Sequence, residues 1–217
     1  MLISPMKKRP LRVTIMFLTF LILSAMLRFN SSILEVVDMV VAIFTQTVAQ
    51  HLLFLAIPAD IVGNLRFVWL AIIIWAFFLR SMGYKVGSWW SIATATALFL
   101  GMLVWSAVVF LNWRQGWVFN QTMPELSLTL WVFLLFQVQN ILIQRLRVAN
   151  WVKKTIAGFY IITWVIVAGN KIVGIDLSFT TAWASTLLGY VFFRFAAALY
   201  LRNAKSWLVI FAVDGKI

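Results

Sequence analysis

The stretch FVWLAIIIWAFFL, residues 67–79, contains no charged side chain, and VTIMFLTFLILSAML, residues 13–27, contains none either. A helix needs about 20 mainly apolar residues to cross the hydrocarbon core of a bilayer. Both stretches reach that length when the more polar residues at their ends, which would lie in the headgroup layer, are counted. They therefore predict helices that span a membrane.

The composition of the whole chain agrees with this prediction. Of the 217 residues, 64% are hydrophobic and 11% are charged, whereas about a quarter of the residues of a soluble domain are charged. We therefore predict an all-α fold, a polytopic membrane helix bundle that forms a single transmembrane domain over residues 1–217. We expect about six transmembrane helices, at 12–28, 61–79, 88–112, 125–144, 155–170 and 179–200.

The charges in the loops predict the orientation of these spans. Thirteen of the eighteen lysines and arginines fall on the side that holds both termini, and all acids but Asp214 fall on the other side or at its edge. Because positively charged loops stay in the cytoplasm, we expect a multi-pass protein of the cell membrane with both termini cytoplasmic. A basic face against anionic lipids also accounts for the net charge of +12 without a nucleic-acid partner.

Residues 30–60 lie between the first two expected spans and carry a different pattern. Apolar residues recur there at helical spacing, with Glu35 and Asp38 on the opposite face. This amphipathic pattern is typical of a helix that lies in the membrane interface or covers a bundle. We predict an interfacial or re-entrant segment on the outer side. The apolar residues of the pattern are Ile33, Val36, Val37, Val40, Ile43 and Phe44.

The sequence offers few residues for catalysis or for a cofactor. It has no cysteine, and His51 is its only histidine. A thiolate nucleophile, a cysteine-ligated metal and a pair of catalytic histidines are therefore excluded. HExxH, GxSxG, Walker and GxGxxG motifs do not occur in their required contexts. We expect no cofactor and no metal ion, which favours a protein without catalytic activity.

The segment VAGNKIVGIDLSF, residues 167–179, places polar residues at the outer mouth of the predicted bundle. Lys171 in this segment and Arg114, at the outer end of the third span, carry charges that suit the phosphate of a lipid headgroup. Together with Asn170 and Asp176 they form the candidate headgroup site. Asp176 also supports a different interpretation, because it lies five residues after Lys171 and can neutralise it in a structural ion pair. Both interpretations stay open at this point.

Arg194 is the one charged residue well inside an expected span. A charge at that depth usually faces a partner or a polar cavity, although a long side chain can also reach the membrane surface. Arg194 could line a transport pathway with amides of the fourth span. These amides are otherwise expected to form hydrogen bonds between helices. They are Gln137, Gln139, Asn140 and Gln144.

The polar residues after the fifth span resemble a motif of a known family. Gly169 and Asn170, followed by Asp176 and Thr180, have the spacing of the third motif of the type-2 phosphatidic acid phosphatase (PAP2) superfamily, roughly S-R-x5-H-x3-D. Asn170 then stands at the arginine, Asp176 at the nucleophilic histidine and Thr180 at its orienting acid. The layout of six spans with short cytoplasmic loops is also similar to this family, which dephosphorylates lipid phosphates at the outer membrane surface.

The other motifs of that family are missing from the chain. Residues 119–123, where P-S-G-H would fall, read FNQTM, and only Arg114 remains of K-x6-R-P. The resemblance therefore implies a PAP2-like bacterial pseudophosphatase of envelope-lipid or cell-wall-precursor metabolism. It would bind a phosphate-bearing isoprenoid or phospholipid, with a membrane-protein partner or as a homo-oligomer. The alternatives are an active lipid phosphatase with unconventional residues and a small transporter or channel subunit.

Overall fold

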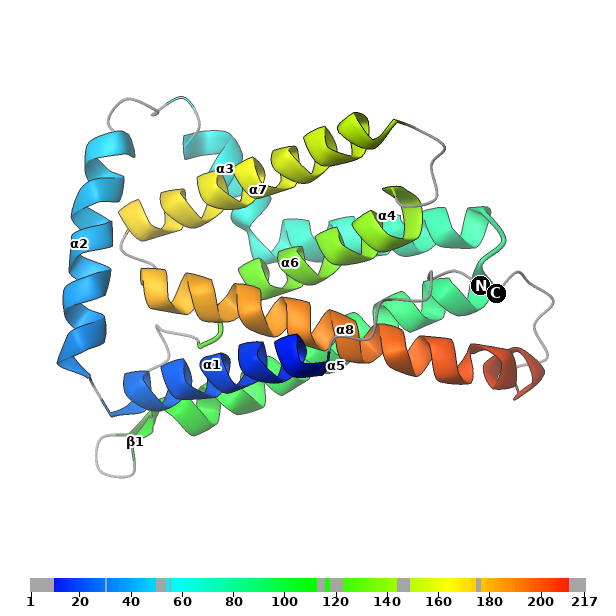
Figure 1. Ribbon diagram of the computed structural model, residues 1–217, viewed down its shortest axis with the longest axis horizontal. Coiled ribbons are helices and arrows are strands. Elements are labelled where there is room, and N and C mark those ends of the chain that lie inside the picture. The colour runs from blue at the N-terminus through cyan, green and yellow to red at the C-terminus, as the bar shows by residue number, and fades with distance from the viewer. Residues whose placement is uncertain are drawn as a thin grey trace.

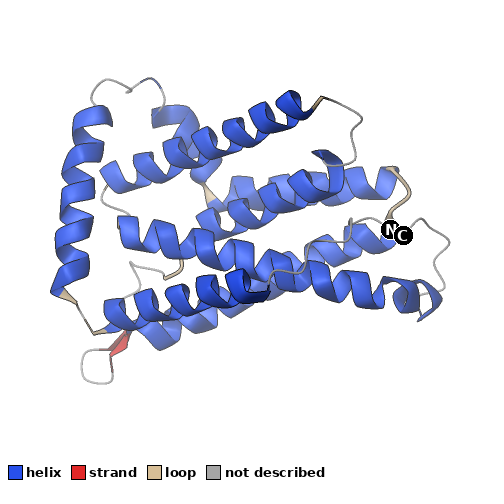
Figure 2. Ribbon diagram, viewed as in Figure 1, coloured by secondary structure: helices blue, strands red, loops and turns tan. Residues whose placement is uncertain are grey.

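The computed structural model consists almost entirely of helices, which confirms the predicted all-α fold (Figure 2). Five of the residues discussed above lie outside the part of the chain that the structure describes: His51, Arg114, Gln144, Asp176 and Asp214. The described residues are 10–29, 31–49, 54, 56–112, 116–117, 123–143, 149–174 and 177–210.

The helices follow one another with short connections. They are α1 (Pro10–Arg28), α2 (Ser32–Ala49), α3 (Ala56–Gly63), α4 (Leu65–Ser81), α5 (Lys85–Phe110), α6 (Leu126–Val138), α7 (Asn150–Val173) and α8 (Phe179–Ile210). A π-helical turn, η2 (Gln139–Ile143), continues α6 directly. Two antiparallel strands of two residues each, β1 (Leu111–Asn112) and β2 (Gly116–Trp117), follow α5.

The long helices form one bundle, and α2 lies across one end of it (Figure 1). We call this end the α2 end. Helices α1, α5 and α7 finish there, whereas α4, α6 and α8 start there (Figure 1). The most extensive packing joins α6 to α8 and α4 to α5.

Several of these helices are able to cross a membrane. Helices α1, α5, α7 and α8 are long and apolar enough, and α3 with α4 would make a fifth span if the pair, which bends by 64°, is counted as one. The remaining expected span, 125–144, corresponds to a shorter apolar helix, Leu126–Ile141. The described helices therefore fit a multi-pass membrane protein.

Helix α4 shows how the outside of the bundle suits a lipid environment. Its residues Ile72 and Leu79 are 1% exposed and belong to the core. On its other face, Ile74 and Phe77 are 60% and 73% exposed. Soluble proteins rarely expose large apolar surfaces of this kind. In a bilayer the same surface faces acyl chains.

The amides of the fourth span are partly architectural, as the sequence predicted. Gln137 is 1% exposed, and its Oε1 accepts hydrogen bonds from Nε1 of Trp75 at 3.0 Å and Oγ of Ser91 at 2.7 Å. These bonds join α6 to α4 and α5. Asn140 instead donates to the carbonyl oxygen of Phe136 in its own helix at 2.8 Å.

The face of α2 that contacts the bundle is not its apolar face. The six apolar residues that define the amphipathic pattern are between 41% and 69% exposed. Helix α2 instead turns Leu34, which is 8% exposed, and Asp38 toward α7 and α8. Helix α2 has this orientation because Asp38 accepts hydrogen bonds from Thr180 in the first turn of α8. The location of α2 in a membrane interface stays a prediction.

Gly189 of α8 permits the close approach of α6, and this generates a prediction. A Cβ atom at Gly189 would lie 2.9 Å from the carbonyl oxygen of Thr129 and 2.9 Å from Cγ1 of Val132. We expect Gly189→Ala to lower the free energy of unfolding by about 1–3 kcal/mol, because the backbone of α6 must move. Thermal or denaturant unfolding in a mild detergent measures this loss.

The matched control is Gly101→Ala in α5. A Cβ atom there would meet no atom within 4 Å, so the stability should stay the same or rise by up to about 1 kcal/mol through the helix propensity of alanine. Equal effects of the two substitutions would contradict the tight α6–α8 contact.

Candidate functional site

Lys171 lies in the last turn of α7, at the α2 end, and forms a partly shielded ion pair. Its Nζ is 2.7 Å from Oε1 of Glu125 and donates to Oγ of Ser127 at 2.8 Å. The side chains of Lys171 and Glu125 are 21% and 16% exposed. Solvent screening is therefore weaker than at an open surface, although the side chain of Lys171 keeps some contact with solvent.

Glu125 is also the N-cap residue of α6. Its Oε2 accepts a hydrogen bond from the backbone N–H of Leu128 at 2.5 Å, and Ser127 donates to Oε1 at 2.9 Å. The partial positive charge of a helix N-terminus stabilises a carboxylate at this position. The charge of Glu125 is thus compensated by the start of α6 as well as by Lys171.

The side chain of Lys171 reaches Glu125 past the bend between α3 and α4. A Cβ atom at Gly63 would lie 3.2 Å from Cε of Lys171 and 3.2 Å from Cγ1 of Val167. The absence of a side chain at Gly63 therefore leaves room for the lysine stem. The bend is itself held against α6, because Nε1 of Trp131 donates to the carbonyl oxygen of Val62 at 2.6 Å.

Two further hydrogen-bonded pairs lie at the α2 end. Nδ2 of Asn170 donates to Oδ1 of Asp60 at 3.2 Å, which joins α7 to α3. Oδ1 of Asp38 accepts from the backbone N–H of Thr180 at 2.7 Å and from its hydroxyl at 2.8 Å, which joins α2 to the first turn of α8. We call these pairs, together with Lys171, Glu125 and Ser127, the polar layer.

The structure brings part of the predicted site together. Asn170 and Lys171 both belong to the polar layer, whereas Arg114 and Asp176 lie outside the described residues. Lys171 forms an ion pair with Glu125, and its pairing with Asp176 stays a prediction. The sequence does hold a signal for the capping role of Glu125. This residue directly precedes the apolar run of α6, which is the position of a helix-capping residue.

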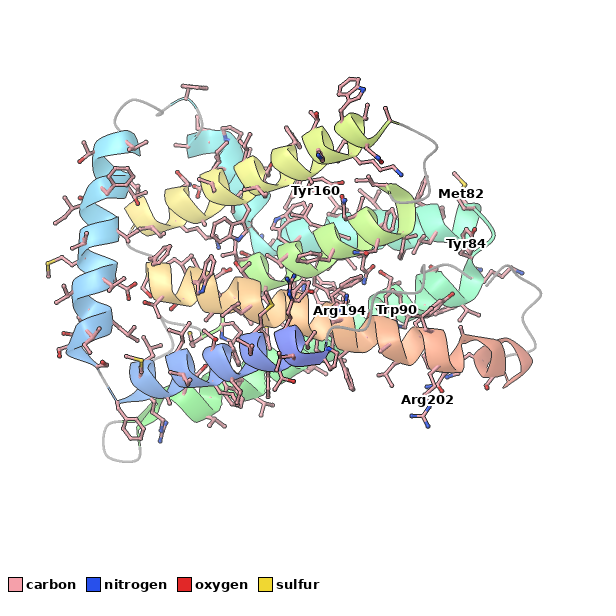
Figure 3. The ribbon with its side chains drawn as sticks, viewed as in Figure 1. Met82, Tyr84, Trp90, Tyr160, Arg194 and Arg202 are labelled. Atoms are coloured by element: carbon pink, nitrogen blue, oxygen red, sulfur yellow. The ribbon has the colours of Figure 1, made fainter. Side chains whose placement is uncertain are left out.

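Arg194 does not belong to the polar layer. It lies midway along α8, where it lines an apolar groove with the first turns of α1. Figure 3 shows it well away from the α2 end. The structure therefore separates Arg194 from Asn170 and Lys171.

Ser127 is the residue of the polar layer whose contacts resemble those of a catalytic nucleophile. Ser127 lies within hydrogen-bond distance of both Lys171 and Glu125, as a serine nucleophile and its base would. However, Ser127 is 1% exposed, so a substrate does not reach its hydroxyl. Lys171 is held in an ion pair, whereas a general base must offer a lone pair. Within the polar layer Asp60 is exposed and the side chain of Lys171 is partly exposed.

Comparison of the chain with protein-family models, curated proteins and solved structures finds no match. Within the described ranges, no three histidine, cysteine, aspartate or glutamate side chains are grouped so that they could hold a metal ion. The geometry of the polar layer is therefore the basis for a functional proposal.

The Asp38–Thr180 contact generates a second prediction. We expect Asp38→Ala to speed amide hydrogen exchange in α2 and at the start of α8 about tenfold or more, because hydrogen bonds to a charged group stabilise strongly. Exchange measured by mass spectrometry on peptides covering 32–49 and 179–186 tests this. Glu35→Ala is the matched control, since Glu35 is an exposed acid one turn away on the same helix. Equal exchange in both variants would show that Asp38 does not hold α2.

Proposed function

We propose that this chain is a non-catalytic, PAP2-like membrane protein that binds a phosphate-bearing lipid at the polar layer. In this proposal the α2 end faces the outside of the cell and both termini are cytoplasmic. The lipid would be an isoprenoid phosphate or a phospholipid, held for envelope-lipid or cell-wall-precursor metabolism. The observation that carries the proposal is the partly exposed side chain of Lys171, a cation in a polar layer at the end of an apolar bundle.

The donors of Lys171 support binding of an anion. An ammonium group has three N–H donors, and contacts to Glu125 and Ser127 account for two of them. The third can reach a phosphate oxygen. Because the N-terminus of α6 shares in compensating Glu125, the lysine need not leave its partner to bind the lipid.

The arrangement of the acids supports the proposed orientation. Asp38, Asp60 and Glu125, which the loop-charge rule assigns to the outer side, all lie at the α2 end. Arg80 and Lys85, assigned to the cytoplasmic side, lie at the other end, where α4 finishes and α5 starts. The alternating directions of the long helices agree with this division (Figure 1).

Single cysteines can test the orientation, because the chain has none of its own. We expect a membrane-impermeant maleimide to label Glu35→Cys on intact cells, since Glu35 is exposed on α2. Lys85→Cys, exposed at the opposite end, should react only after the membrane is permeabilised. The reverse pattern would overturn the proposed orientation.

The binding site is tested by titrating the purified protein with phosphatidic acid or polyprenyl phosphate and counting bound lipid by native mass spectrometry. We expect Lys171→Ala to weaken binding about tenfold or more, because a charge-assisted hydrogen bond to phosphate is lost. Glu125→Gln should strengthen binding severalfold. It removes a negative charge beside the phosphate and keeps an oxygen that can accept from Leu128.

The control is Lys85→Ala, which removes a lysine from the opposite end and should leave binding unchanged. Diacylglycerol and polyprenol, which lack the phosphate, should bind no variant with the affinity of the phosphorylated lipids. If Lys171→Ala and Glu125→Gln lower stability without changing the affinity for either lipid, the ion pair is structural and the proposal fails.

A further inference from the structure

A groove separates α1 from α8 on the side of the bundle away from the α2 end. It has a volume of about 690 Å³, within the range of small-molecule sites. Val13, Thr14 and Phe17 of α1 and Val191, Phe192 and Arg194 of α8 are among its lining residues. Its walls are thus largely apolar, with one arginine among them.

The groove lies beside a region in which α1 and α8 pack closely. Closer to the α2 end, Phe20 of α1 is 2% exposed and packs in one cluster with Ala184 and Leu187 of α8. Toward Pro10, residues of both helices line the groove. Exposed Leu11 and Ile15 on α1, and Phe195 on the rim, continue the apolar surface to the outside. The groove therefore opens sideways, in the direction in which lipids would lie.

Arg194 lies inside the span Phe179–Ala204, and a long charged side chain at that depth can extend toward the headgroup level of the second leaflet. Nε1 of Trp90, near the start of α5, donates to the carbonyl oxygen of Ala196 at 3.2 Å. The tryptophans at 89 and 90 stand at the start of a span, where amphipathic rings favour the headgroup layer.

Arg194 supplies the chemistry that recognises a phosphate. A guanidinium group carries its charge throughout the physiological range and presents five N–H donors in a planar fork that matches phosphate oxygens. Arg194 also interacts within the protein, and this number of donors allows it to do so while binding a ligand. Arg12, exposed beside the α1 wall, adds positive charge at the same end.

We infer that this groove binds one anionic phospholipid of the leaflet opposite the α2 end, with an acyl chain between α1 and α8 and the phosphate on Arg194. The apolar walls accept the chain, and the charge of Arg194 complements the headgroup. The site is separate from the polar layer in place and in leaflet. It does not depend on the function proposed for Lys171.

The test uses the full chain in vesicles of phosphatidylcholine with a minor share of phosphatidylglycerol, followed by native mass spectrometry of the retained lipid. We expect the wild type to retain phosphatidylglycerol in preference to phosphatidylcholine. Arg194→Gln should lower that preference about tenfold, because the charge-assisted contact is lost. Arg194→Lys keeps the positive charge but lacks the planar fork of N–H donors, so it should lose only part of the preference for phosphatidylglycerol.

Two further variants make the result specific. Val191→Trp fills the groove, keeps Arg194 and should expel the bound lipid. This variant still tests whether the groove binds the lipid if Arg194→Gln does not fold. Arg202→Gln, two turns further along α8 and pointing away from the bundle (Figure 3), should change nothing. Arg194→Gln should lower the preference equally in a Lys171→Ala background, which separates the two sites.

The inference is overturned if Val191→Trp retains as much phosphatidylglycerol as the wild type. It is equally overturned if the wild type shows no preference between the two lipids. A lipid-free dimer whose contact is lost in Val191→Trp would assign the groove to a second copy of the chain instead.

Discussion

At the α2 end, the start of α6 depends on a single carboxylate. The first N–H groups of a helix have no partner within it, and little water reaches them inside a membrane bundle. Glu125 accepts from Leu128, holds Lys171 of α7, and donates its own N–H to Oγ of Ser185 on α8 at 2.9 Å. The relative positions of three helices therefore follow from one capping residue and its ion pair.

The presence of the helices could be predicted from the sequence, because length and hydrophobicity decide it. The spans expected at 61–79 and 88–112 correspond to α4 and α5 with small differences at their ends. The break between α3 and α4 was not predicted, although Gly63 and Asn64 in the sequence are a signal for one. There the side chain of Asn64 accepts from the N–H of Arg66 at 2.9 Å and starts a new helix.

The candidate site was harder to predict than the fold. Asn170 and Lys171 were identified because polar residues are rare in so apolar a chain. The contact of Lys171 with Glu125 was missed because Glu125 is 46 residues earlier in the chain. Contacts of this kind depend on how α6 and α7 pack, and the spacing of apolar residues does not fix that packing. The contact between Asp38 and Thr180 was missed for the same reason, because it depends on how α2 packs against α8.

Helix α2 carries most of its apolar side chains on the outside of the protein, with Phe44 69% exposed. In the proposed orientation these side chains enter one leaflet only. A helix inserted into a single leaflet enlarges the area of that leaflet relative to the other, so its binding is sensitive to curvature. The protein would then gather where the membrane bulges outward, and the shape of the membrane would help to decide where in the cell it resides.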